Sequence, residues 1–254
     1  MFYKYLPWLV LLAGIQQVLV PYFVITQGFF NNSDLSLLYV QPASWTFAIW
    51  GLIYTLASIY TIWQFAVHIQ GNDNPILVSN RLYALLLFIG SSVWLLASNF
   101  SQEYLWITFV VLFGMAYVGF KAVSLPMGII EEADSRKERL LSRIILMPYA
   151  AWVNIAVFVN FGSVVGSYDI SLTDTGWLII NLALLSGIVF VTWTQFQRLF
   201  FNPWYGLVVV WASVGIVLAN NINSGSMIIA VLAGLTGLLF LWKSIVYAWY
   251  FLRK

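Results

Sequence analysis

The chain has 254 residues, of which 62% are hydrophobic and only 8% are charged, and its formal net charge is +2. This composition lies far outside the range of soluble globular domains and is typical of an all-α polytopic membrane protein. The absence of cysteine excludes disulfides, thiolate nucleophiles, iron–sulfur clusters and the usual zinc sites, and the small net charge gives no indication of nucleic-acid binding.

Long apolar runs follow one another along the chain, and each is close to the ~20 residues that cross a bilayer as a helix. They lie at Leu6–Val24, Ala43–Val67, Leu82–Asn99, Tyr104–Ala122, Ile144–Val165, Trp177–Phe196, Trp204–Asn220 and Ser226–Trp242. We therefore expect a bundle of eight transmembrane helices joined by short loops. The first run has no obvious A-x-A cleavage motif, so we expect it to be retained as a helix and not removed as a signal peptide.

The basic residues predict the orientation of these spans. Threading eight spans from Lys4 places the remaining lysines and arginines on the same side as Lys4: Arg81, Lys121, Arg136, Lys137, Arg139, Arg143, Arg198, Lys243, Arg253 and Lys254. The opposite loops carry only Asp34, Glu103, Asp169 and Asp174. Because basic residues near span ends stay in the cytoplasm, we expect both termini to be cytoplasmic, in a plasma or inner membrane.

Two loops differ from the other connections. The first outer loop, Gln27–Gln41, begins with polar residues and ends at Pro42, which suits the residue before a helix. The inner loop Ser124–Ser142 contains the charge cluster EEADSRKER. Its alternating signs predict a solvated extension of the next helix, and a regulatory docking site is the alternative.

Ionisable side chains are nearly absent from the predicted spans. Arg81, Glu103, Lys121 and Lys243 lie at or near span ends, where we expect long side chains to reach the interface by snorkelling. The single histidine, His68, cannot form a metal cluster alone, and an axial haem ligand is the alternative to an interfacial histidine. No phosphate-binding glycine loop, HExxH motif or nucleophile elbow is present. We therefore expect no catalytic residue and no metal site, and we do not expect ion-coupled transport.

Aromatic residues are dense, with 13 Trp, 14 Tyr and 19 Phe. Several lie near span ends, where an interfacial belt is expected: Trp8, Trp45, Trp106, Trp177, Trp204, Trp249 and Tyr250. Others lie deeper in their spans: Trp50, Trp63, Trp94, Trp152, Trp193 and Trp211. A buried tryptophan needs a partner for its N–H group, so several of them in one bundle indicate either a ligand chamber or ordinary helix packing.

Two groups of these residues fall on single helical faces. Phe47, Trp50 and Tyr54 follow a spacing of i, i+3, i+7 in the second span. Trp152, Ala156 and Asn160 follow i, i+4, i+8 in the fifth span, where the small Ala156 leaves space beside the tryptophan. Together the two stripes could wall a flat aromatic guest.

At these stripes the chain resembles a known family. The segment Pro42–Tyr54, PASWTFAIWGLIY, is similar to the start of the second helix of the translocator protein family, also called TspO, tryptophan-rich sensory protein or peripheral benzodiazepine receptor. The segment Pro148–Asn160 is similar to the fifth-helix pattern P-Y-x-x-W-x-x-x-A-x-x-x-N of that family, with every marked position present. The resemblance covers about Met1–Gly166. It implies a TspO-like five-helix membrane core at 1–166 and a three-helix C-terminal membrane extension at 167–254.

Members of that family bind porphyrins and hydrophobic aromatic ligands in a pocket inside the bundle. The resemblance implies that Trp50 and Trp152 face this pocket. The third helix of the family carries a Gln and an Asn ahead of a Trp, where this chain has Leu87 and Ser91 ahead of Trp94. The complete expected ligand-binding set is Pro42, Phe47, Trp50, Tyr54, Ser91, Trp94, Tyr149, Trp152, Ala156 and Asn160.

Small residues recur at a spacing of four in three later spans, as Gly162/Gly166, Ala183/Gly187 and Ala233/Gly237. Such pairs let helices approach closely. We expect them to serve packing within the bundle, with homodimerisation as the alternative.

The function that we expect combines these observations with the family resemblance. It is an integral membrane protein that binds a hydrophobic planar ligand, porphyrin- or tetrapyrrole-like, in an aromatic pocket for sensing, handling or transport. No covalently bound cofactor is expected, and the partners are the lipid bilayer and the small molecule. The alternatives are a permease for a neutral solute, a membrane enzyme that degrades the bound tetrapyrrole, and a structural subunit that binds a partner through the EEADSRKER segment.

Overall fold

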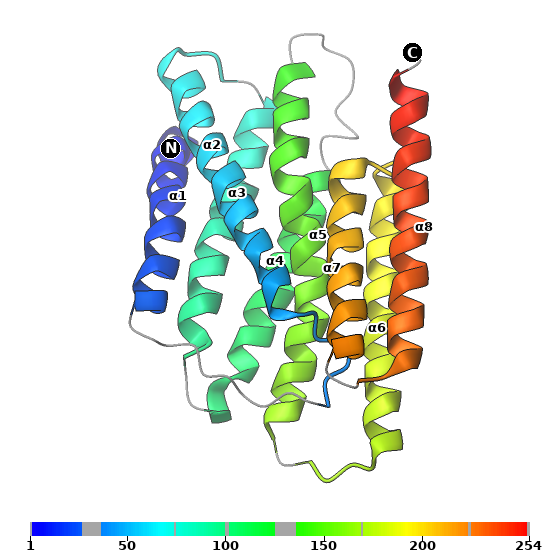
Figure 1. Ribbon diagram of the computed structural model, residues 1–254. Helices are drawn as coiled ribbons and strands as arrows, with labels where there is room; N and C mark the ends of the chain where they lie inside the picture. Colours follow the sequence, from blue (N-terminus) through cyan, green and yellow to red (C-terminus); the bar gives the residue numbers. More distant parts are fainter. Residues whose placement is uncertain are drawn as a thin grey trace. The chain divides into compact units, whose positions relative to one another are not determined.

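The computed structural model describes residues 2–26, 37–73, 75–99, 102–124, 136–168, 170–222 and 225–252 (Figure 1). Within these ranges the regular elements are α1 (Phe2–Thr26), η1 (Ser44–Ala48), α2 (Ile49–Ile69), α3 (Pro75–Ala97), η2 (Gln102–Tyr104), α4 (Trp106–Ser124), α5 (Arg136–Ser167), α6 (Asp174–Arg198), α7 (Pro203–Ile222) and α8 (Met227–Leu252). The two η elements are short 3₁₀ helices. Each of the eight α-helices is long and apolar enough to cross a membrane, which confirms the predicted all-α polytopic bundle.

The fifth α-helix begins earlier than the apolar run predicts. It starts at Arg136, so the basic end of the EEADSRKER segment is helical, as expected for a helical extension. Residues 125–135, and with them the acidic start of that segment, lie outside the described residues. The polar start of the first outer loop, residues 27–36 with Asp34, also lies outside them.

Local capping explains where two of the later helices begin. The Thr173 side chain accepts a hydrogen bond from the Gly176 backbone N–H at 3.2 Å, and α6 starts at Asp174, directly after Thr173. The Asn202 side chain accepts a hydrogen bond from the Trp204 backbone N–H at 3.0 Å. Between these two residues stands Pro203, the first residue of α7, where a missing N–H group costs nothing.

By their contacts the residues form two compact units. Unit 1 comprises Met1–Asn31 and Trp50–Ala150, and unit 2 comprises Asn32–Ile49 and Ala151–Lys254. Helix α5 contributes its first part to unit 1 and its second part to unit 2. The two units group residues by their contacts and do not test the predicted division into 1–166 and 167–254, which stays a prediction.

In unit 1, α3 packs against both α1 and α4. The contact of α4 with α5 needs a glycine, because a Cβ atom at Gly119 would lie 3.2 Å from the Cα atom of Ala150. The contact of α1 with α2 is also close, since Thr61 leaves no room for a methyl group at Gly14. Small residues thus let the helices of this unit approach one another closely.

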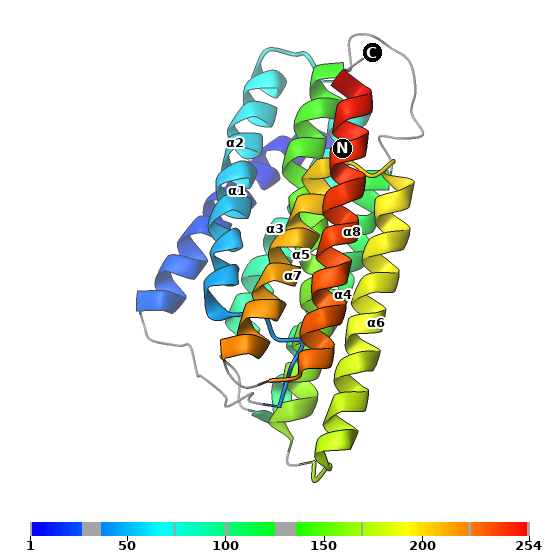
Figure 2. The same ribbon diagram turned by 45° about the vertical axis from the view of Figure 1, so that its right-hand side comes forward.

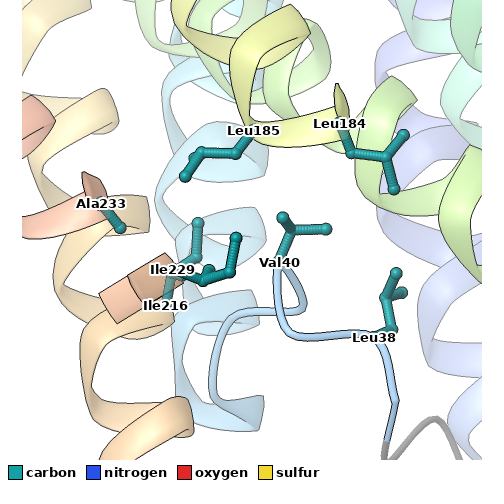
Figure 3. Close-up of a cluster of buried hydrophobic side chains, with 7 residues drawn as sticks. All are labelled: Leu38, Val40, Leu184, Leu185, Ile216, Ile229 and Ala233. Atoms are coloured by element: carbon teal, nitrogen blue, oxygen red, sulfur yellow. The ribbon is translucent and has the colours of Figure 1, made fainter. Parts of the chain in front are cut away.

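In unit 2, α7 and α8 run side by side over most of their length (Figure 2). Residues 37–48, here called the connector, lead along the chain into α2. Two connector side chains insert into a buried apolar cluster with residues of α6, α7 and α8 (Figure 3). The cluster consists of Leu38, Val40, Leu184, Leu185, Ile216, Ile229 and Ala233. The apolar residues of the connector are therefore part of the core formed by the last three helices.

The small residues of the later spans make contacts inside unit 2. Gly162 leaves no room for a Cβ atom against Leu38 and Leu184, and Gly187 leaves none against Phe158. A Cβ atom at Gly237 would lie 3.0 Å from the Cβ atom of Ser213. These contacts support the predicted role in internal packing, and homodimerisation stays an alternative.

Candidate functional site

Four aromatic rings gather in unit 1, and we call them the aromatic cluster: Trp50, Tyr54, Trp94 and Tyr149. The Trp50 ring stacks on Tyr54 at a centroid distance of 5.4 Å and on Trp94 at 5.6 Å, with interplanar angles of 30° and 24°. Tyr149 meets Trp50 edge-on at 6.0 Å. Helices α2, α3 and α5 supply these rings. The structure thus brings together four residues of the predicted ligand-binding set.

The rings of the aromatic cluster differ in burial. Tyr149 is fully buried, whereas Trp50, Tyr54 and Trp94 are half-buried. The three half-buried rings include both members of each stacked pair. Aromatic surface therefore remains that another flat molecule can cover by stacking.

Polar groups around the cluster are mostly paired within the protein. The Tyr149 hydroxyl donates to the Leu87 carbonyl oxygen at 3.0 Å. The Ser91 hydroxyl donates to the Phe88 carbonyl oxygen at 3.1 Å, and Ser91 is a hydrogen-bonding neighbour of the Tyr54 and Tyr149 phenols. Ser91, which the sequence also predicted, therefore lies at the aromatic cluster.

The Trp94 indole is the exception among these groups. Its Nε1 atom is buried, and no residue in the described ranges accepts a hydrogen bond from it. A buried N–H group without an acceptor costs about 1–3 kcal/mol of desolvation. The indole N–H is therefore available to donate a hydrogen bond to a ligand or a water molecule.

The other predicted site residues belong to unit 2. Phe47 of η1 meets Trp152 of α5 edge-on, with ring centroids 5.7 Å apart, and Trp152 is only 2% exposed. Pro42 is buried and packs against α7, where a Cβ atom at Gly215 would lie 3.1 Å from the Pro42 Cβ atom. Ala156 and Asn160 on α5 are half-buried. The structure brings Phe47 and Trp152 together, and the part these five residues take in ligand binding stays a prediction.

Sequence reasoning missed the polar side chains that hold the connector. The Asn181 side chain on α6 donates to the Leu37 carbonyl oxygen at 2.9 Å and accepts from the Val40 N–H at 3.0 Å. Asn220 on α7 donates to the carbonyl oxygen of Tyr39 at 2.7 Å. The available signal was an asparagine inside an apolar span, because such a residue needs a partner there.

A tryptophan of α7 also hydrogen-bonds to the backbone of the connector. The Trp211 indole Nε1 donates to the Thr46 carbonyl oxygen at 2.9 Å, and the Trp211 ring meets Trp45 edge-on at 4.8 Å. The backbone of α7 contributes as well, since the Gly215 carbonyl oxygen accepts from the Ala43 N–H at 3.1 Å. Side chains and backbone of α7 thus hold the second half of the connector, including η1.

The prediction that Arg81 snorkels to the interface is wrong. Arg81 lies in α3 inside a candidate membrane span and is only 1% exposed. Its Nη2 atom is 2.7 Å from the Asp73 carboxylate and 2.8 Å from the Gln64 carbonyl oxygen, while its Nε donates to the Gln64 side chain at 2.7 Å. These three acceptors satisfy the charge, so the arginine stays inside. Lys121 and Glu103 are exposed at helix ends, as expected.

The short loop after α2 completes this group, which we call the Arg81 cluster: Gln64, His68, Asp73 and Arg81. His68 Nδ1 lies 2.8 Å from the second carboxylate oxygen of Asp73. Burial alone would raise the pKa of the Asp73 carboxyl, but hydrogen bonds from Arg81 and His68 and the charge of Arg81 lower it below its ordinary value. Within the described ranges, no three acidic, cysteine or histidine side chains gather closely enough to hold a metal ion.

The predicted aromatic belt needs one correction. Trp8, Trp45, Trp106, Trp204, Trp249 and Tyr250 are exposed near helix ends, as a belt requires. Trp177 is only 6% exposed. It lies one turn before Asn181, on the face of α6 that is turned toward the core of unit 2. Position near a span end therefore did not identify the direction of this side chain.

The chain matches the sequence model described as TSPO-like protein over residues 8–245. The match continues past Gly166, where the predicted resemblance ends, through α6 and α7 and into α8. No curated protein and no solved structure matches the chain.

Proposed function

Because the chain belongs to the TSPO-like protein family, we propose that this integral, multi-pass membrane protein binds a hydrophobic planar ligand on the aromatic cluster of unit 1. The ligand is of the porphyrin or tetrapyrrole class. Binding would serve sensing, handling or transport of that ligand within the membrane.

The observation that carries this proposal is the stack of half-buried rings beside a buried indole N–H. Trp50 and Trp94 lie at 5.6 Å and 24° to each other, so a flat ligand can extend the stack with little reorganisation of the rings. Each aromatic surface that is covered in this way contributes about 1–3 kcal/mol. A carboxylate oxygen of the ligand would accept the Trp94 hydrogen bond, which removes the cost of the unpaired N–H group.

The surroundings of the aromatic cluster favour an apolar ligand. The rings come from helices that can span a membrane, and the cluster contains no charged side chain. The charged Arg81 already has three acceptors in Gln64 and Asp73, so it is not available as a counter-ion. Binding therefore depends on stacking and apolar burial, with few polar anchors.

The proposal is tested by titrating the purified protein in lipid nanodiscs with protoporphyrin IX while tryptophan fluorescence is recorded. Trp50→Ala should weaken binding by about 1–3 kcal/mol, a loss of roughly 5- to 150-fold in affinity. The matched control is Trp106→Ala, because Trp106 is an exposed tryptophan at the start of α4. Equal losses for the two variants would contradict a specific role for the cluster.

A second variant isolates the indole N–H group. Trp94→Phe keeps an aromatic ring and removes the N–H donor. It should weaken porphyrin binding about fivefold without lowering the stability of the ligand-free protein, because no described residue accepts that hydrogen bond. In the same samples, porphyrin loss under light would support the enzyme alternative, and solute flux without fluorescence quenching would support the permease.

A further inference from the structure

We propose that Asn181 and Asn220 are positioning residues, through which α6 and α7 hold the connector and so fix the first turn of α2, where Trp50 lies. This inference rests on the proposed function in one respect, since the effect on ligand binding requires that Trp50 binds the ligand. It also assigns a role to the helices that follow α5.

The connector needs such support because most of it is not helical. Residues 37–43 precede η1 and have no regular secondary structure, so their backbone N–H and C=O groups lack the partners that a helix provides. Leu38 is 5% exposed and Val40 is fully buried, whereas Leu37 at the start of the segment is 39% exposed, so water is excluded as a partner at Leu38 and Val40. Buried backbone groups of this kind must be paired by side chains or by other backbone groups.

The side-chain amides of Asn181 and Asn220 supply some of these partners. Asn181 both donates to Leu37 and accepts from Val40, and its amide nitrogen also donates to the Trp177 carbonyl oxygen of its own helix at 2.8 Å. Asn220 donates to the Tyr39 carbonyl oxygen and, through its oxygen atom, accepts from the Ser226 N–H before α8. The connector residues that these amides hold, Leu37, Tyr39 and Val40, thus lie within four positions of one another. An apolar side chain at position 181 would leave the buried Val40 N–H without this acceptor, and one at position 220 would leave the part-buried Tyr39 carbonyl oxygen without this donor.

The hydrogen bonds from Asn181 and Asn220 to the connector are here called the clamp, and further contacts extend it toward the start of α2. Ala43 and Thr46 bond to the Gly215 backbone and to the Trp211 indole, respectively. Phe47 packs on Trp152, and α2 begins at Ile49 with Trp50 as its second residue. Contacts from α6, α7 and α5 therefore hold the connector at several points between residues 37 and 47, two residues before α2 begins. Rigid placement of a binding residue lowers the entropy cost of binding.

The test compares Asn181→Leu with Gln195→Leu. Gln195 is a matched control because it is an equally buried amide on α6, and no described residue hydrogen-bonds to its side chain. Amide hydrogen exchange of peptides from residues 37–50 is measured first, without ligand. Asn181→Leu should speed exchange there by about tenfold or more, whereas Gln195→Leu should leave it at the wild-type rate. Unchanged exchange in Asn181→Leu would overturn the clamp.

The second measurement is protoporphyrin IX affinity. Asn181→Leu should weaken binding by about tenfold although it does not touch the aromatic cluster. In a Trp50→Ala background the same substitution should weaken binding by less than about twofold, because the residue that the clamp positions is gone. A full tenfold loss in both backgrounds would show general destabilisation and would refute the positioning role.

A milder variant covers the case in which Asn181→Leu does not fold. Trp211→Phe removes only the N–H donor to Thr46 and keeps a ring beside Trp45, at a site that is 38% exposed. It should speed exchange in residues 43–50 and weaken porphyrin binding a few-fold, and wild-type values for both would overturn the proposal. If the wild-type protein binds no porphyrin, the proposed function fails, while the exchange data still decide whether the clamp exists.

Discussion

Replacing Asp73 with asparagine should destabilise the protein by about 1–3 kcal/mol at pH 7. Asparagine has nearly the same shape and keeps an oxygen that can accept a hydrogen bond, so the substitution removes mainly the negative charge. The Arg81 guanidinium would then stay buried with only neutral acceptors, from Gln64 and from the introduced asparagine. A buried charge without a counter-ion is the main cost of breaking such a pair.

The magnitude follows from the unequal burial of the two partners. Removing one partner of a fully buried ion pair costs about 3–5 kcal/mol, whereas exposed pairs contribute about 0–1 kcal/mol. The Arg81 side chain is 1% exposed and the Asp73 side chain is 31% exposed, with 2.7 Å between Nη2 and Oδ1. Water therefore screens the carboxylate in part, and the expected cost lies between the two limits.

The assay is reversible unfolding of the purified protein in mixed detergent and SDS micelles, at pH 7 and at lower pH. The folded pKa of Asp73 lies below its ordinary value, so its stabilising contribution is complete above about pH 5 and is lost as the pH falls through the folded pKa. The stability difference between the wild type and Asp73→Asn should therefore shrink as the pH is lowered below about 4.

The double variant Arg81→Met with Asp73→Asn provides the control. It removes the buried charge as well, so it should be more stable than Asp73→Asn alone. A stability of Asp73→Asn within about 0.5 kcal/mol of the wild type, or a difference that does not change with pH, would refute the interpretation of Arg81 as a buried and paired charge.

Three further predictions concern packing, a buried hydrogen bond and orientation. Gly119→Val should destabilise unit 1 by about 1–3 kcal/mol, because the added side chain would collide with α5. Gly114→Val on the same helix should be tolerated, because no atom lies within 4 Å of a Cβ atom built there. Unfolding in SDS measures both variants, and an equal loss of stability in the two would contradict the close approach of α4 and α5. Tyr205→Phe removes the 2.9 Å bond from the Asn154 side chain and should cost about 1–2 kcal/mol by the same assay, so wild-type stability would show that the bond contributes little. A reporter fused to the C-terminus should report the cytoplasm and one inserted within residues 169–175 the outside, and the opposite result would overturn the predicted orientation.

The eight spans could be predicted from the sequence because their signal is local. Each span is an apolar run of sufficient length, and the structure forms a helix over each of them. Part of the aromatic cluster could be predicted for the same reason, since Trp50 and Tyr54 share one face of one helix. Their association with Trp94 and Tyr149 depends on how α2, α3 and α5 pack, and only the family resemblance indicated it.

Burial of Arg81 could not be predicted from hydropathy or from its position near a span end. It depends on the loop before α3, which brings the Asp73 carboxylate within 2.7 Å, and on Gln64 one helix away. A charged residue near the end of a span can turn toward water or toward the core, and the direction is decided by the available partners. Those partners become visible only in three dimensions.

The roles of Asn181 and Asn220 depend on partners that lie even farther away along the chain than those of Arg81. The Val40 backbone N–H and its acceptor on Asn181 are 141 positions apart in the chain, and the Tyr39 carbonyl oxygen and its donor on Asn220 are 181 positions apart. No periodic pattern or short motif connects positions at such distances. The sequence places Trp177 in the interfacial belt for a related reason, because its core-facing direction is set by the packing of α6 in unit 2.

Equilibrium binding of protoporphyrin IX to the wild-type protein in nanodiscs tests the central claim most directly. Empty nanodiscs of the same lipid composition serve as the reference for partition into the bilayer. The account predicts saturable quenching of tryptophan fluorescence above that reference, with a plateau that Trp50→Ala shifts to higher porphyrin concentration. Quenching that rises linearly with porphyrin and equals the partition into empty nanodiscs would contradict it.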